Sequence, residues 1–283
     1  MRYDISKGLK ASRFPVSYLN EVPKGGWSDE YKTSKIVLRR VEGGVFDRKS
    51  KNGESYSVQI TQPYYLGVFE VTQRQWELVM GTRPSAFKRN DCYRMRPVES
   101  VGYGDIRGRE LGMKWPKSSD VDAGSFVGVL RKKARVHVDL PTLAQLEFAY
   151  RKGGHPKSGQ LRNQHNSSKA LLQADEKLIL QADTTMGTAA VGAYEPNSLG
   201  IYDMIGKVEE ACLDRVAIEK ESEDPIGGVE SAGNSLWTGN GWVHGGNFEV
   251  KVRKTSSGVG YTSGFRLCLG PDLLAAKPKD GKK

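Results

Sequence analysis

The sequence predicts an α+β fold that is irregular and loop-rich, with few helices and short twisted strands. Hydrophobic residues make up only 37% of the 283 residues, while 33 glycines and 12 prolines supply many turns. Short alternating segments near the start are typical of strands, and two capping-box patterns mark the beginnings of helices. A chain of this length can bury a hydrophobic core, and we expect that core to be rich in loops.

The first third of the chain predicts strands followed by a helix. Residues 1–35 are polar without clear periodicity, so we expect an N-terminal arm. Strands are expected next, over residues 36–41, 55–61 and 64–71. Thr72 and Gln75 form a capping box, and Gly81 is placed to end the helix that follows. We expect Trp76 of this helix to lie in the core.

Two further helices are expected before the chain becomes irregular again. The first spans residues 120–132, although its glycines weaken it. The second follows Thr142, which pairs with Gln145 in another capping box, and it ends near Gly153. A polar insertion at 154–180 and then short strands and turns complete the chain. We divide the chain into an arm, one domain and a basic flexible tail, at residues 1–35, 36–270 and 271–283.

The composition limits the classes of partner. The formal net charge is +10, but the basic residues are scattered, for example over residues 39–40, 131–135 and 277–283. Specific nucleic-acid binding is therefore disfavoured, because it requires a clustered basic face. No segment has the apolar length of a membrane span or a secretory signal, so no membrane partner is expected and a cytoplasmic location is the default expectation.

Motifs in the second half of the chain carry a family resemblance. They are D-L-P-T-L-A-Q-L-E-F-A-Y-R at 139–151, N-S-L-G-I-Y-D-M-I-G-K-V-E-E at 197–210, H-G-G-N at 244–247 and G-F-R at 264–266. Together they resemble the formylglycine-generating enzyme family, also called sulfatase-modifying factor domains. The resemblance implies the C-type lectin-like, sulfatase-modifying-factor fold, which belongs to the α+β class.

The chain departs from this family where the chemistry is carried. Family enzymes oxidise a substrate cysteine to formylglycine with Cu(I), which two cysteines hold shortly after the paired glycines; soft thiolates select this ion. Residues 248–255 contain no cysteine here, and Val250 and Thr255 stand roughly where the thiolates would be. Lys207 also replaces an Asn of the family pattern. Copper is therefore not expected, and neither is oxidase activity.

The resemblance also implies structural calcium. One site would take carboxylates and backbone carbonyls from Asp203, Gly206, Val208 and Glu210. Such a curled loop offers the several oxygens that calcium prefers, and Lys207 between them should point outward. Asp183, with the carbonyl of Thr185, falls near the position of a second ion. The alternative interpretation of the first site is an acidic turn without an ion.

The fold is also used as a binding scaffold, with diversity between the paired glycines and G-F-R. Here residues 249–263 are rich in Lys, Arg, Ser, Thr and Tyr, which suits polar recognition, although a plain closing hairpin is an equal alternative. The candidate ligand-binding residues are Trp242, His244, Glu249, Lys251, Arg253 and Tyr261.

The leading hypothesis is a catalytically inactive family member that acts as a ligand-binding or structural module for a protein, peptide or glycan. The first alternative is a divergent oxidase of protein cysteines that recruits Cys212 and Cys268 as sulfur ligands. The second is an electrostatic binder of nucleic acid or acidic glycans. The three hypotheses make different demands on the cysteines and on the basic residues.

Overall fold

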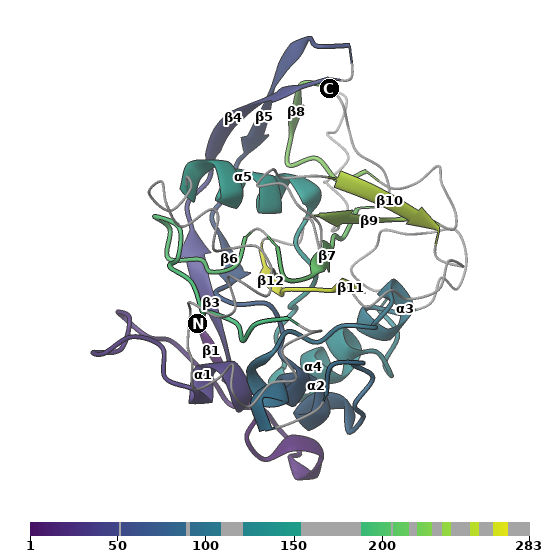
Figure 1. Cartoon of the computed structure of the whole chain (residues 1–283). Helices are drawn as coiled ribbons and strands as arrows, with labels where there is room; N and C mark the ends of the chain where they lie inside the picture. The colour runs from purple at the N-terminus through teal and green to yellow at the C-terminus, as the bar shows by residue number, and fades with distance from the viewer. Residues whose placement is uncertain are drawn as a thin grey trace, which may run out of the picture.

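The structure is a computed structural model. It describes residues 1–50, 52–88, 91–108, 121–153, 188–204, 206–214, 220–227, 234–238, 250–254 and 263–270. In these residues short strands form separate small sheets with helices packed between and below them, so the α+β, loop-rich fold is confirmed (Figure 1). The expected insertion at 154–180 and the tail at 271–283 lie outside the described residues.

The largest described sheet is antiparallel and gathers strands from both ends of the chain. Its order is β12-β6-β3-β1-β2. The bounds are β1 Arg2–Asp4, β2 Val16–Ser17, β3 Lys35–Val41, β6 Tyr64–Gly67 and β12 Cys268–Leu269. The strand expected at 36–41 is thus found as β3, whereas the one expected at 64–71 ends at Gly67. The G-F-R motif comes directly before β12, so this sheet places it beside β6.

The N-terminal arm is continuous with this sheet. Strand β1 pairs with β3 in the register Arg2↔Val37, so backbone hydrogen bonds cross the expected boundary at residue 35. Tyr3 and Phe14 have no exposed surface and belong to the main hydrophobic core. The arm therefore supplies core residues and a sheet partner to the domain.

Of two smaller sheets, one lies at the top of the view in Figure 1 and the other lies to the right of β12. One has the order β4-β5-β8, with bounds Gly44–Lys49, Ser55–Ile60 and Ser222–Glu223. The other has the order β10-β9-β7-β11, with bounds Val250–Lys254, Asn234–Thr238, Glu209–Ala211 and Ser263–Gly264. Strand β11 is parallel to β7, which brings Glu209 and Glu210, at the end of the motif 197–210, beside G-F-R.

The helices begin where their capping residues predict. Helix α2, Gln73–Met80, has both hydrogen bonds of the Thr72–Gln75 capping box, and Gly81 ends it at φ 73°. Helix α5, Leu143–Gly153, has the reciprocal bonds between Thr142 and Gln145. The shorter helical segments are α1 Glu30–Thr33, α3 Tyr103–Ile106, η1 Gly8–Lys10 and η2 Asp91–Met95.

Helix α4, Phe126–Ala134, starts later than the predicted residue 120. The cap is Ser125, whose Oγ accepts a hydrogen bond from the backbone N–H of Gly128 at 3.1 Å. Asp122 instead accepts from the N–H of Gly124 at 2.8 Å, which closes a turn. The aspartate side chain competes for backbone donors and so delays the helix.

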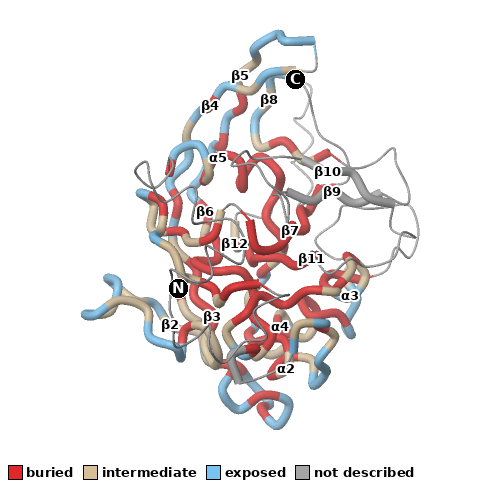
Figure 2. The backbone as a smooth tube through the Cα atoms, viewed as in Figure 1, coloured by how far each residue is buried: buried red, intermediate tan, exposed pale blue. Residues whose placement is uncertain are grey.

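The main core lies where α2 and α4 meet the large sheet (Figure 2). Trp76 is 3% exposed, as expected for a core residue, and its ring centroid lies 5.3 Å from that of Phe126. Phe265 of G-F-R packs edge-on against Phe126 at 5.1 Å. In the described part of the chain, the helices are too short or too polar to cross a membrane.

Candidate functional site

One asparagine holds the signature loop, residues 197–204, against helix α5. Asn197 Oδ1 accepts hydrogen bonds from the N–H groups of Leu199 and Ile201, both at 3.1 Å. Its Nδ2 donates to the carbonyl oxygen of Ala149 in α5 at 3.1 Å. Gly200 has φ 70°, which residues with a side chain rarely adopt. The first residues of the motif thus fix the path of the loop that follows.

Lys207 points into the protein, so the expectation that it points outward was wrong. Its side chain is 1% exposed, and Nζ lies 2.6 Å from Asp203 Oδ1 and 2.7 Å from the carbonyl oxygen of Ala190. The other oxygen of Asp203 accepts from the N–H of Gly192 at 2.6 Å. The expectation assumed alternating side chains, but Asp203 and Lys207 both have φ 56°, in the left-handed region, which breaks the alternation.

The arginine of G-F-R binds Glu210, the last residue of the motif 197–210. Arg266 Nε donates to Glu210 Oε2 at 2.6 Å, and Nη2 donates to Oε1 at 2.5 Å. The same guanidinium donates to the carbonyl oxygens of Gly67, Tyr202 and Asp203 at 3.1–3.2 Å. Arg266 has no exposed surface, and all these acceptors satisfy its buried donors. The pair joins β7, β6 and the signature loop.

A third carboxylate, Glu70, lies within electrostatic range of these two ion pairs. It has no exposed surface, and among the described residues neither of its oxygens has a hydrogen-bond partner. Burial, and next the charges of Asp203 and Glu210, raise the pKa of Glu70 well above its usual value; Lys207 and Arg266 oppose this effect. Glu70 therefore favours its neutral form. We call Glu70, Asp203, Lys207, Glu210 and Arg266 the carboxylate cluster.

The hydroxyl groups of Tyr194 and Thr188 also lack hydrogen-bond partners among the described residues. Asp203 Oδ1 accepts no hydrogen bond there either, so its 2.6 Å contact with Lys207 Nζ is an ion pair without hydrogen-bond geometry. Lys207 Nζ lies 5.4 Å from the ring centroid of Tyr194, within the range of a cation–π interaction. Burial, and next the charge of Asp203, raise the pKa of Tyr194 to about 12, so its hydroxyl keeps its proton at neutral pH. The region is polar but closed from solvent.

The predicted calcium site does not fit this arrangement. Asp203 and Glu210, which would supply its carboxylates, contact Lys207 and Arg266 instead. A divalent ion bound to Asp203 Oδ1 would lie beside the Lys207 ammonium. Two positive charges at so short a separation repel each other strongly. In the described part of the chain, no group of three or more His, Cys, Asp or Glu side chains is placed to hold a metal ion. Gly206 and Val208 lie on the same loop, in the turn before β7.

Several other predicted site residues cannot be placed. Asp183 and Thr185, expected near a second ion, lie outside the described residues, and so do the candidate ligand-binding residues Trp242, His244, Glu249 and Tyr261. The backbone of Lys251 and Arg253 is described: both belong to β10, which lies at one end of its sheet and pairs with β9 in the register Lys251↔Trp237.

Cys212 and Cys268 lie in a single hydrophobic core cluster. Cys212 has no exposed surface and Cys268 is 3% exposed. The Cys268 thiol donates to Gln145 Oε1 at 3.4 Å. Burial, and next the charge of Asp139, raise the pKa of Cys268, which disfavours the thiolate form that copper and oxygen chemistry requires. Cys92 lies in η2.

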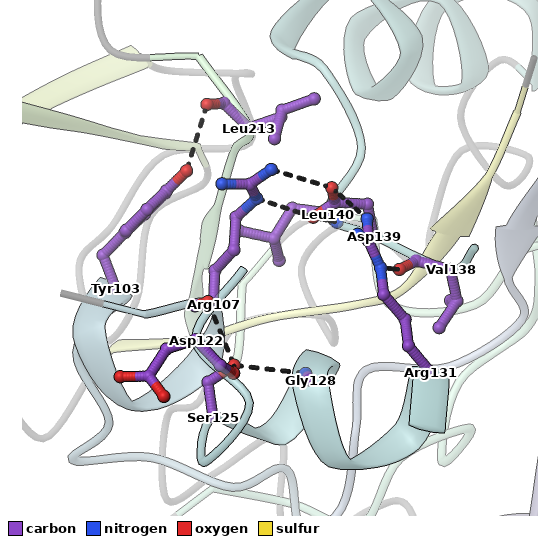
Figure 3. Close-up of polar contacts among 10 residues, drawn as sticks. All are labelled: Tyr103, Arg107, Asp122, Ser125, Gly128, Arg131, Val138, Asp139, Leu140 and Leu213. Carbon is purple, nitrogen blue, oxygen red and sulfur yellow. Dashed lines mark hydrogen bonds and ion pairs between the residues drawn. The ribbon is translucent and has the colours of Figure 1, made fainter. Parts of the chain in front are cut away.

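Asp139, at the start of the D-L-P-T motif, ties the helical half to the C-terminal strand (Figure 3). Arg107 Nε donates to its Oδ1 at 2.9 Å, and Arg131 Nη2 donates to its Oδ2 at 2.7 Å. Its backbone pairs with that of Cys268 through two hydrogen bonds. The contacts of Asp139 therefore give this motif a structural role that requires no bound ligand.

Sequence reasoning missed two buried acids, Glu70 and Asp214. Glu70 is a lone charge in the apolar run G-V-F-E-V at 67–71, which is a usable signal. Asp214 accepts hydrogen bonds from the N–H of Leu143 at 2.6 Å and of Gly227 at 2.9 Å. It thus joins the start of α5 to the D-P-I-G segment. Burial raises the pKa of Asp214 to about 6, although both hydrogen bonds act to lower it.

The sequence is similar to a known family of domains and to a protein of Paenibacillus barcinonensis. The chain matches the Sulfatase-modifying factor enzyme 1-like domain over residues 28–269. Chaperone protein LppX of Paenibacillus barcinonensis is 27% identical over 256 residues, which cover 80% of this chain and 87% of that protein.

Two solved structures share the fold. Treponema denticola variable protein 1 has a TM-score of 0.60 at 20% identity and covers 91% of this chain and 100% of its own. PvdO from Pseudomonas aeruginosa has a TM-score of 0.59 at 18% identity, with coverage of 90% and 100%. At these identities the two likenesses concern the fold alone.

Proposed function

The chain belongs to the family of the Sulfatase-modifying factor enzyme 1-like domain, and from that premise we propose that it is a catalytically inactive member that binds a polypeptide partner. The observation that carries the proposal is the lack of cysteine in residues 248–255. Cu(I) needs soft sulfur ligands, and neither the Val250 nor the Thr255 side chain can supply one. The scaffold is kept while the oxidising centre is lost.

The burial of the remaining described cysteines supports this proposal. The first alternative, a divergent oxidase, would need Cys212 and Cys268 to act together as thiolates. Both lie in one core cluster, which is the observation in favour of that alternative. Their environment is apolar, however, and the raised pKa of Cys268 opposes ionisation.

A polypeptide partner is supported by the relative named a chaperone, LppX, which matches most of this chain. The candidate surface is the segment 249–263, which begins at β10. Lys251, Arg253 and Lys254 outnumber the single acid Glu249 over its first six residues. We therefore propose an acidic, extended polypeptide as the partner, since complementary charge accelerates and orients binding. An extended chain can also pair with a strand at a sheet edge.

The first experiment tests the loss of catalysis. Protein loaded with Cu(I) is incubated aerobically with a cysteine-containing peptide, and aldehyde is measured by mass spectrometry after hydrazine labelling. We expect no aldehyde and no difference between the wild type and the double variant Cys212→Ser, Cys268→Ser. Aldehyde formed by the wild type and lost in the variant would establish the divergent oxidase instead.

The second experiment tests binding. A polyglutamate peptide with a fluorescent label serves as the probe, and fluorescence anisotropy is measured at low and at physiological salt. The charge-reversal pair Lys251→Glu, Arg253→Glu should weaken binding at least tenfold. The matched pair Lys7→Glu, Lys10→Glu changes the net charge equally at two exposed positions of the N-terminal arm and should leave affinity within twofold.

Two outcomes would refute the proposed surface. Equal losses in both charge-reversal pairs would mean that overall charge alone attracts the probe. Tighter binding of a duplex DNA than of the peptide at physiological salt would favour the electrostatic nucleic-acid binder, because phosphate contacts then dominate. Deletion of residues 277–283 shows how much of the binding of either probe, peptide or DNA, is due to the basic tail.

A further inference from the structure

The carboxylate cluster contains three carboxyl groups and two cationic groups, and it is closed from solvent. Glu70, Asp203 and Glu210 are each at most 9% exposed, while Lys207 and Arg266 are at most 1% exposed. Charges buried in a protein are strongly destabilising unless they are paired. An arrangement of this kind needs cations at fixed positions, either bound from solution or supplied by the chain.

The two ion pairs divide the cluster into separate parts. Arg266 and Glu210 satisfy each other through two parallel hydrogen bonds at 2.6 Å and 2.5 Å. Asp203 is left to Lys207, whose Nζ lies 2.6 Å from Oδ1. Without Lys207, the Asp203 carboxylate would keep, among the described residues, the hydrogen bond from the N–H of Gly192.

The surroundings of the Lys207 ammonium are those of a bound cation. It lies 2.6 Å from a carboxylate oxygen and 2.7 Å from the carbonyl oxygen of Ala190, and it faces the ring of Tyr194. Carboxylate and backbone carbonyl oxygens are also the ligands that a hard cation such as calcium takes, at slightly shorter distances. The ammonium thus has a carboxylate oxygen and a carbonyl oxygen as close neighbours, on a loop that bends back on itself.

We propose that Lys207 is a built-in cation: its ammonium group does in this loop the structural work of a bound divalent ion, so the fold does not depend on calcium. The left-handed backbone at both Asp203 and Lys207 brings the carboxylate and the ammonium face to face. Since the charge is covalently attached, the site is filled at any free calcium concentration. This inference is independent of the proposed partner binding.

The test compares thermal unfolding in excess EDTA and in excess calcium, followed by circular dichroism. The wild type should show the same melting temperature in both buffers and should contain no stoichiometric calcium by atomic emission. A melting temperature that rises with calcium, or falls with EDTA, would overturn the proposal. These wild-type measurements decide the matter even if every variant fails to fold.

Two variants separate the charge of Lys207 from its volume. Lys207→Met keeps most of the apolar stem without the charge, so it should lower the melting temperature by several degrees in both buffers. Lys207→Asn supplies an oxygen and leaves space, so it should be destabilised in EDTA and recover at least half of the loss in calcium. Failure of calcium to distinguish Lys207→Asn from Lys207→Met would contradict the claim that the ammonium occupies a cation position.

A matched control is available at the surface. Lys35 Nζ lies 2.7 Å from Glu30 Oε2, but the glutamate is 46% exposed. Lys35→Asn removes an ion pair of similar length from a solvated position, where such pairs contribute little. It should change the melting temperature far less than Lys207→Met, and it should not respond to calcium. An equal effect at both lysines would mean that the Lys207 contact is an ordinary ion pair, which would contradict the proposal.

Discussion

Replacement of Asp214 by Asn should change how the stability of this protein depends on pH. Asp214 is 3% exposed, and its carboxyl accepts the N–H groups of Leu143 and Gly227. Burial raises its pKa to about 6 in the folded protein. An unfolded chain has an aspartate pKa of about 3.9, so folding favours the protonated form.

The sign and size of the effect follow from this difference. Because the folded pKa is raised, the contribution of Asp214 to stability is fully present below the unfolded pKa and is lost as pH rises through the folded pKa. A shift of about two pKa units corresponds to about 3 kcal/mol of unfolding free energy. Asn cannot ionise, so the stability of the variant does not fall in this way as pH rises. Its amide nitrogen would face one backbone N–H, which lowers its stability by a roughly pH-independent amount of about 1–3 kcal/mol.

The assay is urea unfolding of the wild type and Asp214→Asn at closely spaced pH values from acid to neutral. The stability of the variant minus that of the wild type should increase by about 2 kcal/mol between pH 4 and pH 7. Asp4→Asn is the control, because hydrogen bonds from Ser6 lower the pKa of Asp4 and its pH dependence has the opposite sign. Parallel pH profiles for the wild type and Asp214→Asn would refute the argument that burial disfavours the charged carboxyl.

Three further changes test the packing and the ion pairs by urea unfolding. Arg266→Met should lower stability by about 3–5 kcal/mol, because it leaves Glu210 buried and unpaired, and a loss below 1 kcal/mol would contradict that role. Trp76→Ala removes the ring stacked on Phe126 and should cost about 3–5 kcal/mol, whereas a near-neutral result would mean that the core refills the space. Thr72→Ala removes the cap of α2 and should cost about 1 kcal/mol, with Thr72→Ser restoring most of it.

Local rules in the sequence predicted the elements whose signals are short-range. The capping boxes at Thr72 and Thr142 located the starts of α2 and α5, because a cap depends on residues only three apart. The alternation in residues 55–61 likewise located β5, which spans Ser55–Ile60. The start of α4 was missed by several residues, since Asp122 closes a turn that the periodicity of the apolar residues does not reveal.

The family scaffold and the absence of cysteine from residues 248–255 can be read from the sequence, because both depend only on which residues stand in which order. The contacts of the predicted calcium ligands Asp203 and Glu210 are visible only in the folded protein. Arg266 binds Glu210 across a separation of 56 positions in the sequence. Glu70, which follows β6 in the chain, comes within electrostatic range of both residues. The inward turn of Lys207 depends on left-handed backbone at Asp203 and at Lys207 itself. Charge pairing between distant segments is set by packing, and a residue pattern along the chain does not contain that information.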